Sequence, residues 1–490
     1  MGSIGANANP LPPLRGDGPW YVEVPAAEQP EALFRRLIGA AGLIWFDSAD
    51  TDSPFGAASF LAWEPFETLT VPVDAPDPLP HLGRRLAEFR SATLPELPGF
   101  QGGCAGLWSF DLARSLERLP APAHRDLELP ALQVGLYGRV VGWDHRTGRC
   151  WIVAHGFPER TTEARRERAE REIAEAWELL HRRTESAREG GASPYSPRRE
   201  GRDGMRVDLA CRYEVPKCAG VLSNFPRDGF LEAVARGIEA IRNGDIFQVN
   251  LAHRLALPAR HSAAELYLRM RRRNPAPFAA YFDGGSAEIV SASPERLFAV
   301  RDGRIESRPI KGTTLRSHMP EVDLPAAGIL RSSAKDRAEN LMIVDLLRND
   351  LSRVCDVDSI RVTQLCDIER YRTVQHLVSA IEGRLAPGLE PVDVVAALFP
   401  GGSITGAPKI RAMELIAEIE PTPRAAYCGS IGYLGFDGSA DLNILIRTVT
   451  DTGGWWTFPV GGGIVVQSDP RKELDETWQK ARGMLQAVLA

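Results

Sequence analysis

The segment that most constrains the fold is a pair of short apolar runs joined by a tight turn near the middle of the chain. Residues 297–300 have the composition of a strand, and Arg301-Asp302-Gly303 has that of a hairpin turn leading into a second strand at residues 305–310. We therefore predict antiparallel β-structure here. In this prediction Lys311 leaves the second strand just before the flexible Gly312, which would hold the lysine at a fixed place.

Two roles are open for Lys311 on this evidence. A lysine at the end of a strand commonly lies at the surface, with its ammonium in water. A nucleophilic lysine needs its pKa lowered from about 10.4 toward neutrality, which requires about 4–5 kcal/mol of differential environment. Nothing adjacent in the sequence provides that environment, so the decision depends on other parts of the chain.

Composition places the chain among large globular proteins. Its 490 residues are 44% apolar and 25% charged, and the net charge of −6 gives no basic field that would attract nucleic acid. The first residues lack the basic and apolar regions of a signal peptide, and no apolar run approaches membrane-spanning length, so we expect a cytoplasmic protein without a membrane partner. Seven cysteines without a C-x-x-C pair predict reduced thiols rather than disulfides or structural zinc.

Changes in composition divide the chain into three parts. Residues 1–185 form a mixed α and β N-terminal region that begins with a loose tail at 1–18 and ends with a charged helix at 161–185. Residues 186–206 are polar and rich in Gly and Pro, typical of a linker or disordered loop. Residues 207–490 form the remaining region, which carries the motifs described next. Further N-terminal strands are expected at 43–48, 58–63, 132–143 and 150–154.

A helix followed by a strand opens the C-terminal region. Asn224 and Pro226 are typical of a helix start, and Gly244 of its end. In the strand that follows, alternation places Gln248 and Asn250 on one face. Two amides on one face can line a binding pocket or face water, and the sequence alone leaves both open.

Acidic residues on two predicted helices are candidate metal ligands. Residues 333–354 read as one long helix containing Glu339, and Asp469-Pro470 is a good start for a last helix in which Glu473, Glu476 and Lys480 share one face. That face could be exposed, with a Glu476–Lys480 ion pair. Alternatively, Glu339 and Glu476 could meet to bind Mg²⁺, which prefers carboxylate oxygens and retained waters. Spacing does not decide between the two.

Glycine-rich runs and an arginine are candidate anion contacts. The Gly461-Gly462-Gly463 run could present N–H groups to an anion, or simply allow close packing. Residues 401–409 superficially resemble a phosphate loop but fail its pattern, because Ala407 follows Gly406 where lysine is required. Alternation over residues 442–447 predicts a strand that turns Arg447 away from its aliphatic neighbours, as a bidentate clamp for a carboxylate.

Together these motifs resemble component I of aminodeoxychorismate synthase and its relative, component I of anthranilate synthase, in the family of chorismate-utilising enzymes. The resemblance rests on residues 291–296, Pro309-Ile310-Lys311-Gly312-Thr313 and the motifs beyond, and covers nearly all of residues 224–490, with patches such as 100–103 before them. It implies an α+β fold with large antiparallel β-sheets flanked by helices. The anthranilate branch carries alanine at the position of Lys311, so the lysine favours the aminodeoxychorismate branch.

The resemblance also implies roles for individual residues. Lys311 would be the nucleophile, Glu295 the general acid and then base, and His376 a group that positions or polarises the substrate. Without the resemblance, His376 in its apolar run would be read as a core residue. Mg²⁺ would be held by Glu339 and Glu476, with Glu473 nearby. The implied substrate contacts are Gln248, Ser403, Thr405, Tyr427, Arg447, Gly461, Gly462, Gly463 and Lys480.

The implied reaction converts chorismate and ammonia to 4-amino-4-deoxychorismate. A separate glutamine amidotransferase subunit would supply the ammonia, because no glutaminase nucleophile motif is present, and a separate lyase would make 4-aminobenzoate, a precursor for folate. Isochorismate and salicylate synthases carry a water-activating lysine at the position of Gln248, so the amide favours ammonia as the nucleophile. The signature Leu-x-Glu-Ser, which accompanies bound tryptophan in anthranilate synthases, is replaced here by Trp45-Phe46-Asp47-Ser48; we therefore expect a core strand there rather than tryptophan control.

Two alternatives remain at this point. Anthranilate synthase component I shares nearly every motif but makes 2-aminobenzoate. A non-catalytic chorismate-binding partner of the amidotransferase would bind without turnover, and the joint presence of the catalytic and metal candidates argues against it.

Overall fold

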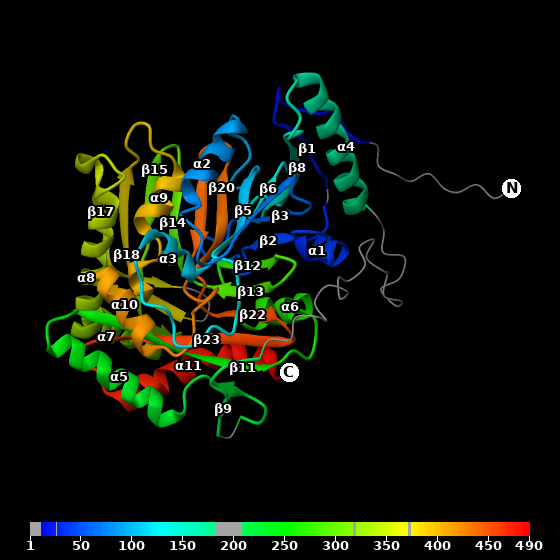
Figure 1. Cartoon of the computed structure of the whole chain (residues 1–490). Coiled ribbons are helices and arrows are strands. Elements are labelled where there is room, and N and C mark those ends of the chain that lie inside the picture. The colour runs from blue at the N-terminus through cyan, green and yellow to red at the C-terminus, as the bar shows by residue number, and fades with distance from the viewer. Residues whose placement is uncertain (1–10, 26, 182–207, 217, 317–319, 371–373) are drawn as a thin grey trace.

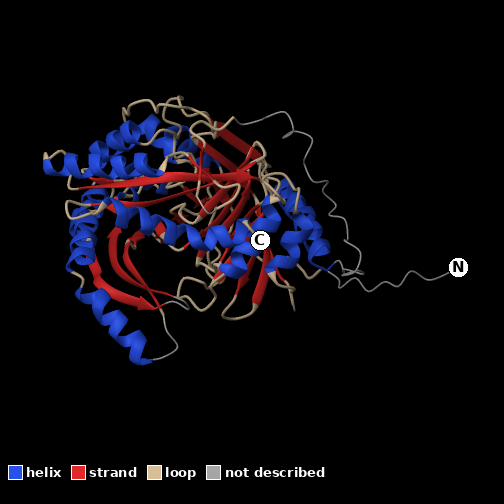
Figure 2. Ribbon diagram, turned by 90° about the horizontal axis from the view of Figure 1, so that it is seen from below, coloured by secondary structure: helices blue, strands red, loops and turns tan. Residues whose placement is uncertain are grey.

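The computed structural model describes residues 11–25, 27–181, 208–216, 218–316, 320–370 and 374–490. Within these residues the strands form two large sheets in which neighbouring strands pair antiparallel. Helices surround the strands on several sides (Figures 1 and 2). The α+β class with large antiparallel sheets flanked by helices is therefore confirmed.

The first sheet contains thirteen of the described strands. Its order is β1 (Trp20–Glu23), β8 (Arg149–Ala154), β7 (Arg139–Asp144), β3 (Ala58–Ala62), β2 (Ile44–Asp47), β12 (Phe278–Asp283), β13 (Glu288–Ser293), β22 (Thr448–Thr452), β23 (Trp455–Ile464), β11 (Gln248–Pro258), β10 (Leu222–Ser223) and β9 (Tyr213–Glu214), with β19 (Gly406–Ala407) paired to β11.

The second sheet contains ten described strands. Its order is β16 (Ile310–Leu315), β18 (Val374–Arg384), β15 (Arg304–Ser307), β14 (Arg296–Arg301), β21 (Ala440–Asn443), β20 (Ser430–Gly435), β5 (Gly103–Trp108), β6 (Leu132–Tyr137) and β4 (Glu67–Val71), with β17 (Arg361–Arg370) paired to β18.

The helices pack around these sheets. They are α1 (Pro30–Leu37), α2 (Leu79–Glu88), α3 (Ala113–Leu116), α4 (Thr162–His181), α5 (Arg227–Arg242), α6 (Ala263–Arg273), α7 (Pro320–Ser332), α8 (Ala334–Ser352), α9 (Pro391–Leu398), α10 (Lys409–Ile419) and α11 (Pro470–Val488), with short 3-10 turns η1 (Phe110–Leu112), η2 (Val357–Ser359) and η3 (Gly402–Ile404). Helices α5 and α11 contact each other and the strand pair β11–β23, as Figure 1 shows at the bottom of the molecule.

Both sheets combine strands from the two ends of the chain. In the first sheet β2 pairs with β12, so that Trp45 lies opposite Tyr281, and in the second β5 pairs with β20. The predicted single strand over residues 132–143 is wrong. The chain leaves the second sheet after β6, bends at Gly138 and enters the first sheet as β7, because the two halves of this apolar run serve different cores.

Several other local predictions are confirmed. Helix α4 buries Ile173, Trp177 and Leu180 beneath its charged face. The segment at Trp45 is a core strand, in which buried Asp47 accepts hydrogen bonds from the Tyr267 hydroxyl at 2.9 Å and from Arg271 at 2.8 Å. The predicted linker and most of the predicted tail lie outside the described residues.

All seven cysteines are free, and five of them are buried. Among the described helices, none is both long enough and apolar enough to cross a bilayer.

Candidate active site

Glu295 lies where the chain passes from one sheet to the other. Strand β13 ends at Ser293 in the first sheet, and β14 begins one residue after Glu295 in the second. Pro294 interrupts the ladder between them because it has no N–H to donate. The Ser293 hydroxyl accepts a hydrogen bond from the Glu295 N–H at 3.2 Å and donates one to the Ile444 carbonyl at 2.6 Å. The crossing therefore fixes a buried carboxyl group between the two sheets.

The prediction that Lys311 follows the end of a strand is wrong in detail. Strand β15 ends at Ser307, and Lys311 lies inside the next strand, β16. The register against β18 shifts between Lys311 and Thr313, which makes a β-bulge at Gly312 with a φ of 75°. A bulge redirects the neighbouring side chain, and its positive φ favours glycine. The lysine therefore lies inside a strand that pairs with β18 both before and after it, rather than at a free strand end.

The Lys311 amine contacts polar groups on two other elements, η3 and α8. Nζ donates to the Ser403 carbonyl at 3.3 Å and lies 3.8 Å from Glu339 Oε2. Burial lowers the pKa of Lys311 because it disfavours the charged ammonium, while Glu339 opposes this shift. The lowered pKa favours a neutral, nucleophilic amine, which is the environment that the local sequence lacked.

The Glu295 carboxyl group also contacts η3. Its Oε1 accepts a hydrogen bond from the Ser403 hydroxyl at 2.9 Å, and the same serine binds Lys311 through its carbonyl. Burial raises the pKa of Glu295 to about 7, although the Ser403 hydrogen bond and the Lys311 charge both act to lower it. A carboxyl group with a pKa near neutrality can both donate and accept a proton at physiological pH.

His376 lies across the bulge from Lys311. It belongs to β18, and its Nδ1 is 2.8 Å from the Thr313 hydroxyl. Burial lowers the pKa of His376 to about 4, and the charge of Arg447 lowers it further. The imidazole is therefore neutral at pH 7 and can form hydrogen bonds to a substrate without adding charge.

The strand predicted over residues 442–447 is not formed. Strand β21 ends at Asn443 and β22 begins at Thr448, and between them Arg447 adopts a left-handed conformation with a φ of 53°. The chain turns here because it leaves the second sheet for the first. The guanidinium nevertheless lies close enough to Tyr427 and His376 to interact with both electrostatically. Within the described parts of the chain it forms no hydrogen bond or ion pair with a side chain, so it can bind an added carboxylate.

The glycine run lies against the predicted amide. Strand β23 carries Gly463, and a Cβ atom added there would lie 2.6 Å from Gln248 Nε2 and 3.5 Å from Lys311 Nζ. Gln248 is 1% exposed, and neither polar atom of its amide has a hydrogen-bond partner among the described residues. Asn250 Oδ1 is also buried and has no hydrogen-bond partner in the same part of the chain. Buried amides without partners carry a free-energy cost that a bound ligand can relieve.

Both predicted acidic helices are formed. Helix α8 starts at its N-cap Ser333 and α11 at its N-cap Asp469, as predicted. A Cβ atom added at Gly462 would lie 3.5 Å from Glu473 Oε2, 3.6 Å from Lys480 Nζ and 3.8 Å from Glu476 Oε1. Three side chains predicted to share one face of α11 therefore converge on the glycine run.

Each of these carboxylates is paired with a lysine. Glu476 lies 2.8 Å from Lys480, and Lys480 also donates to the Gly461 carbonyl at 2.9 Å. Glu339 interacts with Lys311 and, at 3.9 Å, with Lys335, which also lies 3.6 Å from Glu473. No group of three or more His, Cys, Asp or Glu side chains within the described ranges is already arranged to hold a metal ion.

The pKa values of the two outer carboxyl groups move in opposite directions. Burial raises the pKa of Glu339, against the charges of Lys311 and Lys335. Burial also acts to raise the pKa of Glu476, but Lys480 outweighs it and lowers the pKa below its usual value. Glu339 Oε1 and Glu473 Oε2 are buried and accept no hydrogen bond from any residue that the structure describes. Unsatisfied carboxylate oxygens of this kind suit a hard divalent cation.

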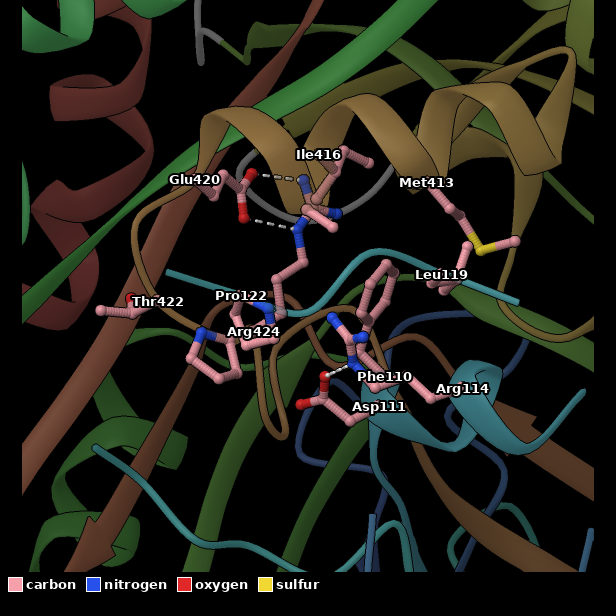
Figure 3. Close-up of a pocket in the computed structure, with 12 residues that line it drawn as sticks. Phe110, Asp111, Arg114, Leu119, Pro122, Met413, Ile416, Glu420, Thr422 and Arg424 are labelled. Carbon is pink, nitrogen blue, oxygen red and sulfur yellow. Dashed lines mark hydrogen bonds and ion pairs between the residues drawn. The ribbon is translucent and has the colours of Figure 1, made fainter. Parts of the chain in front are cut away.

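A buried ion pair that was not predicted from the sequence lies next to the site and connects two of its elements. Arg424 forms two hydrogen bonds to Glu420, of 2.7 and 3.0 Å (Figure 3). It also donates to the carbonyls of Ile404 at 2.9 Å and Asn250 at 2.7 Å. Glu420 in turn accepts the Ala252 N–H at 2.9 Å. The pair thus ties β11 to the loop that carries Ser403. Only its i, i+4 spacing was visible in the sequence, and that spacing is common on helix surfaces.

Two further predicted substrate contacts, Thr405 and Tyr427, interact with their own surroundings in the protein. The Thr405 hydroxyl donates to the Gly401 carbonyl at 2.9 Å, within its own loop. Tyr427 is buried, with the Arg424 guanidinium over its ring at 5.7 Å. Lys335, which bridges α8 and α11, was also missed; its position four residues before Glu339 was the available signal.

Comparison with known proteins identifies the family. The model of the chorismate binding enzyme family matches residues 43–486. The chain belongs to this family. Component 1 of anthranilate synthase from Thermus thermophilus is 39% identical over 85% of this chain and 83% of that protein. Component 1 of aminodeoxychorismate synthase from Escherichia coli is 36% identical over 94% of this chain and 96% of that protein.

Solved structures agree with the family assignment. Anthranilate synthase component I from Streptococcus pneumoniae superposes with a TM-score of 0.71 and 28% identity, covering 88% of this chain and 92% of that one. The protein is therefore a chorismate-utilising enzyme. Relatives with two different activities match at similar identity, so overall similarity does not separate the activities, and the site residues must.

Proposed function

We propose that this protein is component I of an aminodeoxychorismate synthase, which converts chorismate and ammonia to 4-amino-4-deoxychorismate. The observation that carries the proposal is the Lys311 amine. The lysine side chain is only 13% exposed, the pKa of its amine is lowered, and the amine shares Ser403 with a carboxyl group whose pKa is about 7. Such a pair provides a nucleophile beside a proton donor, which is what displacement of a hydroxyl group requires.

In the first step the neutral Lys311 amine attacks C2 of chorismate. The N–C2 bond forms, the two ring double bonds shift, and the C4–O bond breaks as Glu295 donates its proton, so that the hydroxyl leaves as water. The product of this step is a covalent adduct on Lys311. Glu295 is then a carboxylate, ready to act as a base.

In the second step ammonia adds at C4. The double bonds shift back, the C2–N bond breaks, and Lys311 leaves as an amine while Glu295 removes a proton from the new amino group. A separate glutamine amidotransferase subunit supplies the ammonia, in line with the name "component 1" carried by the relatives. Gln248 lies beside Lys311 at Gly463, where its amide cannot activate water as a lysine could.

Chorismate is a dianion, and the site offers a place for each carboxylate. Arg447, without an acidic partner among the described residues, can clamp one of them beside neutral His376. The other faces Lys480 and the glycine run. Mg²⁺ would be held by Glu339, Glu473 and Glu476 and would neutralise that carboxylate; Glu339 Oε1 and Glu473 Oε2, which accept no hydrogen bond from the described residues, fit this role.

The test is to incubate the purified chain with chorismate, Mg²⁺ and ammonium and to determine the ring position of the new amino group by NMR. The proposal expects 4-amino-4-deoxychorismate, with most of the activity lost in Lys311→Ala. Formation of 2-aminobenzoate would instead identify an anthranilate synthase component I. Binding of chorismate without any turnover would identify a non-catalytic partner of the amidotransferase.

A further inference from the structure

Lys335 is a charged side chain at the candidate site that has no role in the proposed reaction. It lies in the first turn of α8, and its ammonium is 3.9 Å from Glu339 on the same helix and 3.6 Å from Glu473 on α11. Lys335 therefore links the two helices through ion pairs with Glu339 and Glu473. Its side chain is 47% exposed, so the ammonium reaches the site from the solvent side.

Composition shows that a lysine at this place is unusual for the chain. Only six of its 58 lysine and arginine residues are lysines, and the other exposed basic positions on α8 are arginines. Three of the six, Lys311, Lys335 and Lys480, are paired with the carboxylates of this one site. Lysine and arginine differ in how they bind carboxylates. The lysine ammonium is a compact charge on a flexible side chain, whereas the planar guanidinium forms rigid bidentate hydrogen bonds.

We infer that Lys335 is the resting counter-ion of the metal site. Its ammonium neutralises Glu339 and Glu473 until the divalent cation binds, and it then withdraws to solvent along its flexible stem. The inference rests on the proposed function, which assigns the cation to these carboxylates. The exposure of the two residues favours replacement of the ammonium by the cation. Lys335 is half-exposed and can move into solvent, while Glu473 is 4% exposed and stays in the site.

Charge balance adds a consequence for substrate binding. A divalent cation alone adds excess positive charge to this site, and a chorismate dianion alone adds excess negative charge. Both together restore the balance. Cation and chorismate should therefore strengthen each other's binding, and this coupling is reciprocal. Removal of the Lys335 charge should strengthen the binding of the free cation and reduce the coupling.

The experiment is calorimetric titration of the full chain with MgCl₂ at constant ionic strength, without chorismate, and again with chorismate present. Lys335→Met should tighten Mg²⁺ binding in the absence of chorismate by about tenfold, since it removes a competing charge within 4 Å of two ligands. Lys335→Arg should weaken it by about threefold or more, because the guanidinium fork holds both carboxylates more firmly. A purely structural role for Lys335 would weaken binding in both variants.

Two further variants separate the possible failures. Lys472→Met removes the same charge from an exposed position next to Glu473, and it should change Mg²⁺ affinity less than twofold. Glu473→Gln should abolish tight binding. If Lys335→Met binds Mg²⁺ no more tightly than the wild type while Glu473→Gln is impaired, the metal site stands and the counter-ion inference is overturned. If Glu473→Gln binds like the wild type, the proposed metal site itself fails and the inference falls with it.

Discussion

Replacement of Glu295 by glutamine tests the electrostatics of the site directly. The carboxyl group is buried, and its pKa is raised from 4.5 to about 7. Because the folded-state pKa lies above the unfolded value, the folded protein binds this proton more tightly. The associated stability is fully present below pH 4.5 and is lost as the pH rises through 7. Glutamine has nearly the same shape and cannot ionise, so the variant does not suffer this loss.

The size of the effect follows from the shift. Each pKa unit corresponds to about 1.4 kcal/mol, so the unfolding free energy of Glu295→Gln relative to wild type should rise by about 3 kcal/mol between pH 4.5 and 7 and stay constant above pH 7. Urea unfolding followed by tryptophan fluorescence across this range measures it. Glu232→Gln, on the exposed side of α5, controls for the lost charge.

The same variant must also lose the proton donor. Formation of the covalent adduct should slow by about a hundredfold or more. In the wild type, the protonated fraction of Glu295 falls as the pH rises through 7. A stability difference that does not change with pH, or a variant that forms the adduct at the wild-type rate, would refute this account of Glu295.

Two further substitutions test the surroundings of the nucleophile. Gly463→Ala places a methyl group 2.6 Å from Gln248 Nε2 and 3.5 Å from Lys311 Nζ, so we expect kcat/KM for chorismate to fall by about tenfold to a hundredfold with the thermal midpoint little changed; unaltered steady-state kinetics would contradict this. Arg424→Met leaves buried Glu420 unpaired and should cost about 3–5 kcal/mol of unfolding free energy in urea, whereas a cost below about 1 kcal/mol would show that the pair does not hold the site together.

Much of the fold was accessible from local sequence patterns. Both acidic helices were located from the sequence, and Asp469 was recognised as the residue that caps the first turn of α11; the structure shows that Ser333 caps α8 in the same way. Apolar alternation located many strands. It failed at residues 132–143 and 442–447, because each of these runs crosses from one sheet to the other, and alternation carries no information about which sheet a strand joins.

The site was accessible only in part. The carboxylates of α11 were placed on one face by helical spacing, and the structure brings them to the glycine run. The enclosure of Lys311 could not be predicted, since Ser403 and Glu339 lie far from it in sequence and the β-bulge at Gly312 depends on pairing with β18. Lys335 was missed because, alone, an i, i+4 pair on a helix indicates an exposed surface.

The central claim is that Lys311 attacks the substrate. The most direct measurement is peptide mass spectrometry of the chain after reaction with chorismate and Mg²⁺ in the absence of ammonia, followed by acid quench. We predict a mass increase on Lys311 equal to chorismate minus one water, discharged when ammonium is added and absent in Lys311→Ala. An unmodified Lys311 in a chain that still makes 4-amino-4-deoxychorismate, or an adduct on another residue, would contradict the claim.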